Sequence, residues 1–215
     1  MNAIIPHNFF HGTNSFFIDY ISRYGFGGYN LAKESKALEL LSVLNEIAKL
    51  EIPEKYKTAG AGLFQSVVNQ MLLQGGGDSM NWQHGAVYIT PSRNRALRYA
   101  VKNKLGSEIC TTIFQVYDLL IKEGIDKAKD VIAHYSIINE LFEKNGEPIV
   151  IEISDLTQDD LLSEGGASPK TALCLLDEIS LKDEIEFGDL TLDDIGFRLN
   201  KVIPFEDLKI YQVRK

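Results

Sequence analysis

The spacing of apolar residues predicts several amphipathic helices in the first third of the chain. In residues 15–24 apolar side chains recur on one helical face, and Gly25 ends the run. Residues 31–50 carry apolar side chains at steps of three and four, which predicts a longer helix that ends before Pro53. A third helix is expected over roughly residues 61–74, where a run of glycines closes it.

The rest of the pattern predicts short strands between further helices. Strands are expected at residues 9–11, 86–90, 148–153, 195–203 and 208–213. Helices are expected after Pro91 and near residues 107–122 and 126–144, whereas 171–179 fits either a helix or a strand. This order predicts a single α+β domain over residues 1–215, with a mostly antiparallel sheet and a helical insertion at about 31–74.

Composition places the chain among ordinary globular proteins. It has 215 residues, of which 45% are hydrophobic and 24% charged. No run approaches the roughly 18 apolar residues of a membrane span, and no secretory signal is visible. Cys110 and Cys174 lack the spacing of a metal site, so we expect two small core residues and no bound metal. These features favour a cytoplasmic protein, or one delivered into the cytoplasm of a host or target cell.

The net charge of −8 argues against generic nucleic-acid binding, but the charge is unevenly distributed. Acidic residues are concentrated in residues 151–194, and residues 91–104 contain no acid. The basic residues of that second segment are Arg93, Arg95, Arg98, Lys102 and Lys104. Such a run is typical of a solvated helix face. Its position directly after Tyr88 leaves contact with a diphosphate or another anionic substrate as the alternative.

Two short segments carry the candidate chemistry. Phe9-Phe10-His11-Gly12-Thr13 lies at the first expected strand, and Tyr88 lies on a later strand, eleven residues before Tyr99 on the next helix. Together they resemble the ADP-ribosyltransferase superfamily, in its diphtheria-toxin and poly(ADP-ribose) polymerase branch, which binds NAD with a His and a Tyr. The resemblance implies a split antiparallel β-sheet with helical insertions, and a cleft for NAD between its halves.

The resemblance also implies roles for individual residues. His11 is expected to bind the adenosine-side ribose of NAD, and the main chain of Gly12 the nicotinamide carboxamide. A glycine suits that role because it lacks the Cβ that would keep a ligand away. Tyr88 and Tyr99 would line the nicotinamide ring through stacking and cation–π attraction. Thr13 and Ser92 complete the expected contacts with NAD. The alternative is that His11 is a packed structural histidine and that Tyr88 and Tyr99 are core aromatic residues with no role in binding.

The catalytic acid is the weakest part of the resemblance. Active members carry a Glu at the start of a late strand, where its charge stabilises the cationic ribose. The corresponding segment here has no Glu inside it. A gap-free placement puts Asp194 at that position, and a slip of one or two residues puts Gly196 or Phe197 there. Glu164 is a second candidate acid, whereas Glu206 lies too late. We therefore predict His11, Tyr88 and Asp194 as the catalytic residues.

These features favour an NAD-dependent mono-ADP-ribosyltransferase that modifies a protein or nucleic acid. A compact transferase of this kind is typical of a bacterial toxin, effector or phage-defence enzyme, whose partners are its acceptor and a cognate antitoxin. The missing Glu leaves open a non-catalytic module that binds a nucleotide or a partner on the same fold. An NAD-dependent RNA 2′-phosphotransferase is a third reading. The resemblance implies that such an enzyme needs several arginines around the cleft, including one beside the histidine. Arg93, Arg98 and Arg198 are candidates, but the residue beside His11 is Phe10.

Overall fold

The chain folds into two compact units. The computed structural model describes residues 3–74, 76–77, 80–81, 84–144, 146–164, 168–180 and 192–213. Unit 1 comprises Met1–Tyr29, Ala86–Gly106 and Glu147–Lys215, and unit 2 comprises Asn30–Gly85 and Ser107–Gly146. Unit 2 therefore includes the expected insertion at 31–74 but extends well beyond it, because residues 107–146 belong to the same unit.

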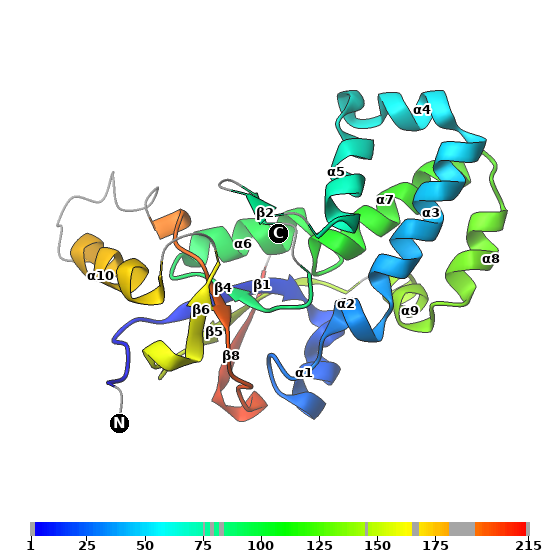
Figure 1. Cartoon of the computed structure of the whole chain (residues 1–215). Coiled ribbons are helices and arrows are strands. Elements are labelled where there is room, and N and C mark those ends of the chain that lie inside the picture. Colours follow the sequence, from blue (N-terminus) through cyan, green and yellow to red (C-terminus); the bar gives the residue numbers. More distant parts are fainter. Residues whose placement is uncertain are drawn as a thin grey trace. The chain divides into compact units, whose positions relative to one another are not determined.

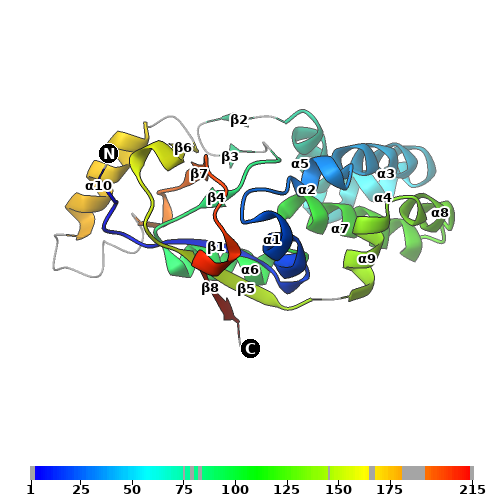
Figure 2. The same ribbon diagram turned by 90° about the horizontal axis from the view of Figure 1, so that it is seen from below.

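Unit 1 contains the sheets. Its strands are β1 (Phe9–Asn14), β4 (Tyr88–Ile89), β5 (Pro148–Ile153), β6 (Leu161–Ser163), β7 (Phe197–Leu199) and β8 (Leu208–Gln212). Within the described ranges they form two three-stranded antiparallel sheets, ordered β1-β5-β8 and β4-β7-β6 (Figure 2). The sheets are linked where Phe10 N donates to Thr90 O at 2.7 Å and Thr90 N donates to Phe10 O at 3.0 Å. The buried rings of Phe9 and Phe197 also meet edge to face, with centroids 5.6 Å apart.

Helices flank these sheets. They are η1 (Ser15–Phe17), α1 (Ile18–Tyr24), α6 (Arg93–Lys102), η3 (Gln158–Asp160), α10 (Pro169–Ser180) and η4 (Phe205–Asp207). Helix α6 packs along β1 and β5 (Figure 1). The approach is so close that a Cβ on Gly12 would lie 2.0 Å from the carbonyl oxygen of Ala96. Ala96 and Ala100 are buried in this contact, so small residues on both sides allow the helix to reach the strand.

Unit 2 is mainly helical. Its elements are α2 (Leu31–Glu34), α3 (Ala37–Glu51), α4 (Pro53–Thr58), η2 (Ala59–Gly62), α5 (Phe64–Leu72), β2 (Gly76–Gly77), β3 (Met80–Asn81), α7 (Glu108–Lys122), α8 (Lys127–Ala133) and α9 (Ser136–Lys144). The apolar faces of α3 and α7 pack together to form the centre of its core. One polar pair lies within it: Tyr56 Oη donates to Asn45 Oδ1 at 2.8 Å, and both residues are buried.

The expectation of mixed helix and strand with antiparallel pairing is confirmed, and three local predictions need correction. The helix expected over 31–50 is broken at Lys36, whose φ of 53° lies in the left-handed region. Pro53 begins helix α4 rather than only ending the one before, as its fixed φ allows at a first helical position. Cys110 is buried as expected, but Cys174 is exposed on α10 and is not a core residue.

Candidate functional site

The structure brings His11 and Tyr88 together although 77 positions separate them in the chain. His11 lies on β1 and Tyr88 on β4, and the backbone link between these strands holds both in register. His11 Nδ1 donates to the main-chain oxygen of Tyr88 at 2.7 Å. The imidazole also meets the ring of Phe26 edge to face, with centroids 5.1 Å apart. The position and orientation of the imidazole are thus fixed by neighbours on two other segments of unit 1.

The hydrogen bond to Tyr88 determines which nitrogen of His11 can accept a ligand's hydrogen. A carbonyl oxygen only accepts, so Nδ1 carries the hydrogen and Nε2 has a lone pair in the neutral ring. Burial lowers the pKa of His11, and the Tyr88 carbonyl only partly opposes this effect. In the described part of the chain Nε2 has no hydrogen-bond partner. The ring therefore offers a neutral acceptor, which suits a hydroxyl donor such as that of a ribose.

Gly12 and Thr13, two of the residues expected to contact NAD, also stabilise the packing of unit 1. The Cβ position of Gly12 points at α6, so close packing against Ala96 accounts for a glycine there. The hydroxyl of Thr13, which is buried, donates to the carbonyl of Gly106 at 3.1 Å. Gly12 and Thr13 thus fasten β1 to α6 and to the loop that follows it. The sequence alone explains the glycine at position 12 by the close approach of a ligand. In the structure, the missing Cβ allows the close approach of helix α6.

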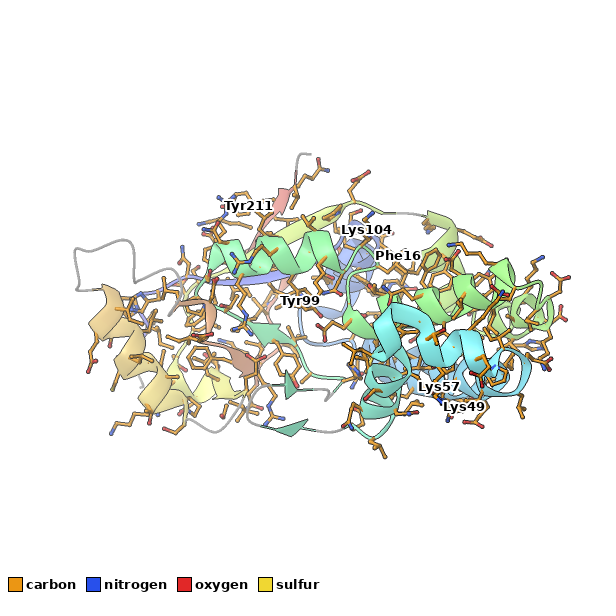
Figure 3. All side chains as sticks on the ribbon, turned by 90° about the horizontal axis from the view of Figure 1, so that it is seen from above. Phe16, Lys49, Lys57, Tyr99, Lys104 and Tyr211 are labelled. Carbon is orange, nitrogen blue, oxygen red and sulfur yellow. The ribbon has the colours of Figure 1, made fainter. Side chains whose placement is uncertain are left out.

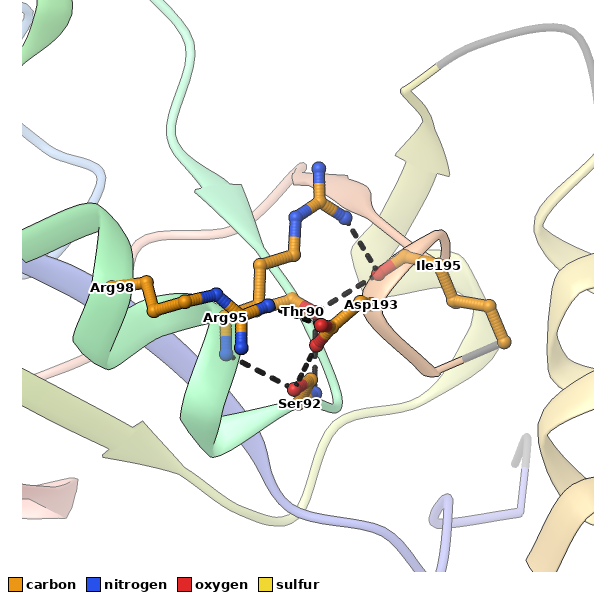
Figure 4. A network of polar contacts seen from close by, with 6 residues as sticks. All are labelled: Thr90, Ser92, Arg95, Arg98, Asp193 and Ile195. Carbon is orange, nitrogen blue, oxygen red and sulfur yellow. Dashed lines mark hydrogen bonds and ion pairs between the residues drawn. The ribbon is translucent and has the colours of Figure 1, made fainter. Parts of the chain in front are cut away.

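A polar network ties the start of α6 to residues 192–196 (Figure 4). Ser92 caps the helix by accepting from Arg95 N at 3.1 Å, and its hydroxyl donates to Asp193 Oδ1 at 2.5 Å. Arg98 pairs with the other oxygen of Asp193. Burial by itself would raise the pKa of Asp193, but these donors and the nearby arginine charges hold it below its usual value. Ser92 therefore anchors a carboxylate, a role that the sequence did not predict.

The same segment is held by two further hydrogen bonds. Thr90 Oγ1 and Arg95 Nη1 both donate to the carbonyl of Ile195, at 3.0 and 3.1 Å. Tyr99, labelled in Figure 3, follows Arg95 by four residues on α6, which is about one helical turn. Tyr99 is half-buried, which leaves part of its ring accessible. The α6 side that carries Ser92 and Arg95 is thus directed to Asp193 and Ile195.

The arrangement of carboxylates differs from the expectation for Asp194. Asp194 is exposed and has no hydrogen-bond or ion-pair partner in the described ranges. Glu164, just after β6, is 25% exposed and lies 3.7 Å from Arg95. Its Oε2 is only 1.5 Å from where a Cβ on Gly196 would stand. The carboxylate of Glu164 therefore fills the space that a side chain at position 196, on the late strand, would otherwise enter.

The register of the second sheet sets which side chains share a face. Tyr88 lies directly opposite Arg198, and Ile89 opposite Phe197. Paired residues in antiparallel strands project from the same face, and successive residues alternate. Ile89 and Phe197 are buried in the core, so Tyr88 and Arg198 project from the opposite face. Position 196 shares that face, and with it the carboxylate of Glu164.

Two of the five basic residues in 91–104 face carboxylates within unit 1. Arg95 faces Glu164 and Arg98 pairs with Asp193, whereas Arg93 lies over the ring of Tyr211 on β8, 5.0 Å from its centroid. In the parts of the chain that are described, no group of three or more His, Cys, Asp or Glu side chains could hold a metal ion. Nor is any described helix long and apolar enough to cross a bilayer.

Comparison with known proteins adds no relative to this picture. No family model, no curated protein and no solved structure matches the chain. The functional argument therefore depends on the geometry of unit 1 itself.

Proposed function

We propose that unit 1 binds NAD and transfers its ADP-ribose group to a nucleophile on a macromolecule, releasing nicotinamide. The observation that carries the proposal is the contact between His11 and Tyr88. The two residues on which the resemblance to ADP-ribosyltransferases depends are neighbours, and His11 is held in the tautomer that accepts a hydroxyl hydrogen. Both sheets and α6 belong to the same unit.

Each residue has a defined task in this proposal. His11 Nε2 accepts a hydrogen bond from a ribose hydroxyl, and the ring of Tyr88 stacks on the nicotinamide. The bond between nicotinamide and ribose C1′ breaks, and its electron pair stays with the nicotinamide nitrogen. The acceptor's nucleophile forms the new bond to C1′ and gives its proton to solvent. A fixed carboxylate near C1′ lowers the barrier by stabilising the positive charge that develops there.

We assign that carboxylate to Glu164 in place of the predicted Asp194. Glu164 lies on the Tyr88 face of the second sheet, and its carboxylate occupies the side-chain space of Gly196. The acid that follows β6 can thus serve where the residue before β7 is a glycine. Asp193 is unsuited, because its two oxygens already accept from Ser92 and Arg98.

A binding module without catalysis is the second candidate, and one observation favours it. Arg95 lies 3.7 Å from Glu164 and offsets part of its negative charge. In this alternative the ion pair fixes the sheet edge, and NAD or another nucleotide binds without cleavage.

Nicotinamide release separates these possibilities. The protein is incubated with NAD and with protein, DNA or RNA as acceptor, and release is measured by chromatography while NAD binding is measured by calorimetry. We expect His11→Ala and Tyr88→Ala to weaken binding, and Glu164→Gln to abolish release while NAD still binds. Glu178→Gln, on exposed α10, is the matched control and should release nicotinamide like the unchanged protein.

The variants also decide between the acids and the functions. If Asp194→Asn abolishes release and Glu164→Gln does not, the catalytic acid is Asp194. Binding without release in the unchanged protein would favour the binding module. Absence of both would refute the proposal of an NAD site.

A further inference from the structure

The guanidinium group of Arg198 is held by a hydrogen bond at Nε, and its two Nη groups have no partner in the described ranges. Its Nε donates to the carbonyl of Ser163 at 3.1 Å, which ties β7 to β6. In the ranges that the structure describes, neither Nη group has a hydrogen-bond or ion-pair partner. Arg95 and Arg98 of α6 differ in this respect, because they face carboxylates. Arg198 thus combines a fixed position with donors that remain available.

The neighbour of Arg198 on the same sheet face is Tyr88. The two residues are directly paired across β4 and β7, which places their Cβ atoms about 4.5–5.5 Å apart. Both are half-buried. Tyr88 and Arg198 therefore project as neighbours from the sheet face turned away from the Phe197 core.

This pairing suits a ligand in which an aromatic ring is connected to an anion. The planar guanidinium group matches the oxygens of a phosphate, and its anchored Nε reduces the entropy lost when an anion binds. The tyrosine ring offers a stacking surface. We propose that Arg198 binds the phosphate on the nicotinamide side of the ligand whose ring stacks on Tyr88. This inference rests on the proposed function, and it names the group that the site recognises besides the ring and the ribose.

Two ligands that differ by a single phosphate test the proposal. Nicotinamide riboside and nicotinamide mononucleotide are titrated into the full chain and binding is followed by calorimetry. We expect the mononucleotide to bind about tenfold or more tightly than the riboside, as for a charge-assisted hydrogen bond. Arg198→Gln should remove this preference, and Arg198→Lys, which keeps the charge without the fork, should retain part of it.

A matched variant distinguishes a local contact from a loss of overall charge. Arg23, on α1, lies over the ring of Tyr24 at 6.0 Å and is exposed. Arg23→Gln removes the same charge and should keep the full preference for the mononucleotide. Thermal unfolding of each variant shows that it is folded. The proposal is overturned if Arg198→Gln keeps the preference, or if Arg23→Gln loses as much of it.

Inorganic pyrophosphate separates failure of this inference from failure of the NAD site. If no nicotinamide ligand binds but pyrophosphate binds and Arg198→Gln weakens it, the anion site stands and the NAD proposal fails. If NAD binds equally well to Arg198→Gln and the unchanged protein, the NAD proposal stands and the role of Arg198 fails. If neither kind of ligand binds, both are wrong.

Discussion

In unit 2 the buried side chains of Asn45 and Tyr56 bond to each other inside a helical core, whereas in unit 1 His11 and Arg198 each have nitrogens without a partner in the described ranges. The hydroxyl of Tyr56 and the amide oxygen of Asn45 meet at 2.8 Å. His11 and Arg198 instead each donate one hydrogen bond, from Nδ1 to Tyr88 O and from Nε to Ser163 O. Their remaining nitrogens have no partner in the described ranges. A polar group that is fixed but incompletely bonded is prepared for a ligand. The comparison supports the binding site that we propose in unit 1, whereas the polar pair of unit 2 stabilises its core.

The largest effect is expected from Gly12→Ala in unit 1. Its Cβ would lie 2.0 Å from Ala96 O and 2.9 Å from Ala100 N, and these are backbone atoms that cannot rotate away. We expect a loss of at least about 3 kcal/mol in the free energy of unfolding, at the upper end of overpacking costs. Urea unfolding followed by circular dichroism measures it.

Gly124→Ala in unit 2 is the control for this change. No atom lies within 4 Å of its Cβ position, so only the positive φ of 77° opposes the new side chain. That strain costs about 1–2 kcal/mol. Equal losses for the two variants would show that α6 does not press on β1 as described.

Tyr56→Phe tests the polar pair of unit 2 and should have the second largest effect. The change leaves Asn45 Oδ1 buried without its donor, which costs about 1–3 kcal/mol. Tyr135→Phe is the control, because its hydroxyl donates to exposed Glu39 at 3.0 Å and its loss should stay within about 0.5 kcal/mol. Ligand binding by unit 1 should not change in either variant. A loss of NAD affinity in Tyr56→Phe would contradict the separation of roles.

Asp193→Ala tests the network at the start of α6. Asp193 accepts from Ser92 and Arg98 and its side chain is 22% exposed, so removal should cost about 1 kcal/mol. Asp194→Ala, at an exposed position without such contacts in the described ranges, should change stability by less than about 0.5 kcal/mol. The reverse order of these losses would mean that residue 194, and not residue 193, joins α6. Both variants are compared by thermal unfolding at one pH.

The smallest effect is a pH dependence that involves one histidine in each unit. Burial lowers the pKa of His11 in unit 1 and of His84 in unit 2. Above the unfolded value of about 6.5 both states are neutral. Below it the unfolded chain binds protons more readily, so stability is full above about pH 6.5 and decreases as the pH falls further.

Unfolding free energies measured between pH 7.5 and 5.5 check this expectation. His11→Gln and His84→Gln should each flatten the curve in part, and the double variant more than either. In unit 2, Nε2 of His84 is buried without a partner in the described ranges, which makes its protonation unfavourable as well. An unchanged slope in both single variants would contradict the role of burial.

The elements that the sequence predicted well have strong local signals. Strand β5 spans residues 148–153 as predicted, because an apolar run follows a turn and a proline. Helix α7 follows its amphipathic pattern and begins after Ser107, which accepts from Cys110 N as its N-cap. The break at Lys36 has no such signal, because the apolar spacing continues across it.

Parts of the candidate site could likewise be predicted from the sequence, whereas others depend on long-range contacts. The distance in sequence between His11 and Tyr88 could be bridged only through the resemblance, because no local pattern links them. The position of Glu164 depends on the register between β6 and β7, whose residues lie more than thirty positions apart in the chain. Choosing Asp193 or Asp194 requires knowing which of two adjacent side chains faces Ser92. A sequence pattern supplies neither the register nor the direction of a side chain, so it could not show that Asp193 contacts Ser92 or that Arg95 faces Glu164.

The pairing of β1 has a consequence for synthesis. On the ribosome, Phe9–Asn14 emerges more than a hundred residues before its partner Pro148–Ile153. All helices of unit 2 have been made by then. During this interval β1 exposes its edge, with Phe9 unpacked, and is a place where a nascent chain can misassemble. Chaperone dependence during translation should therefore concentrate on the first strand rather than on the helices.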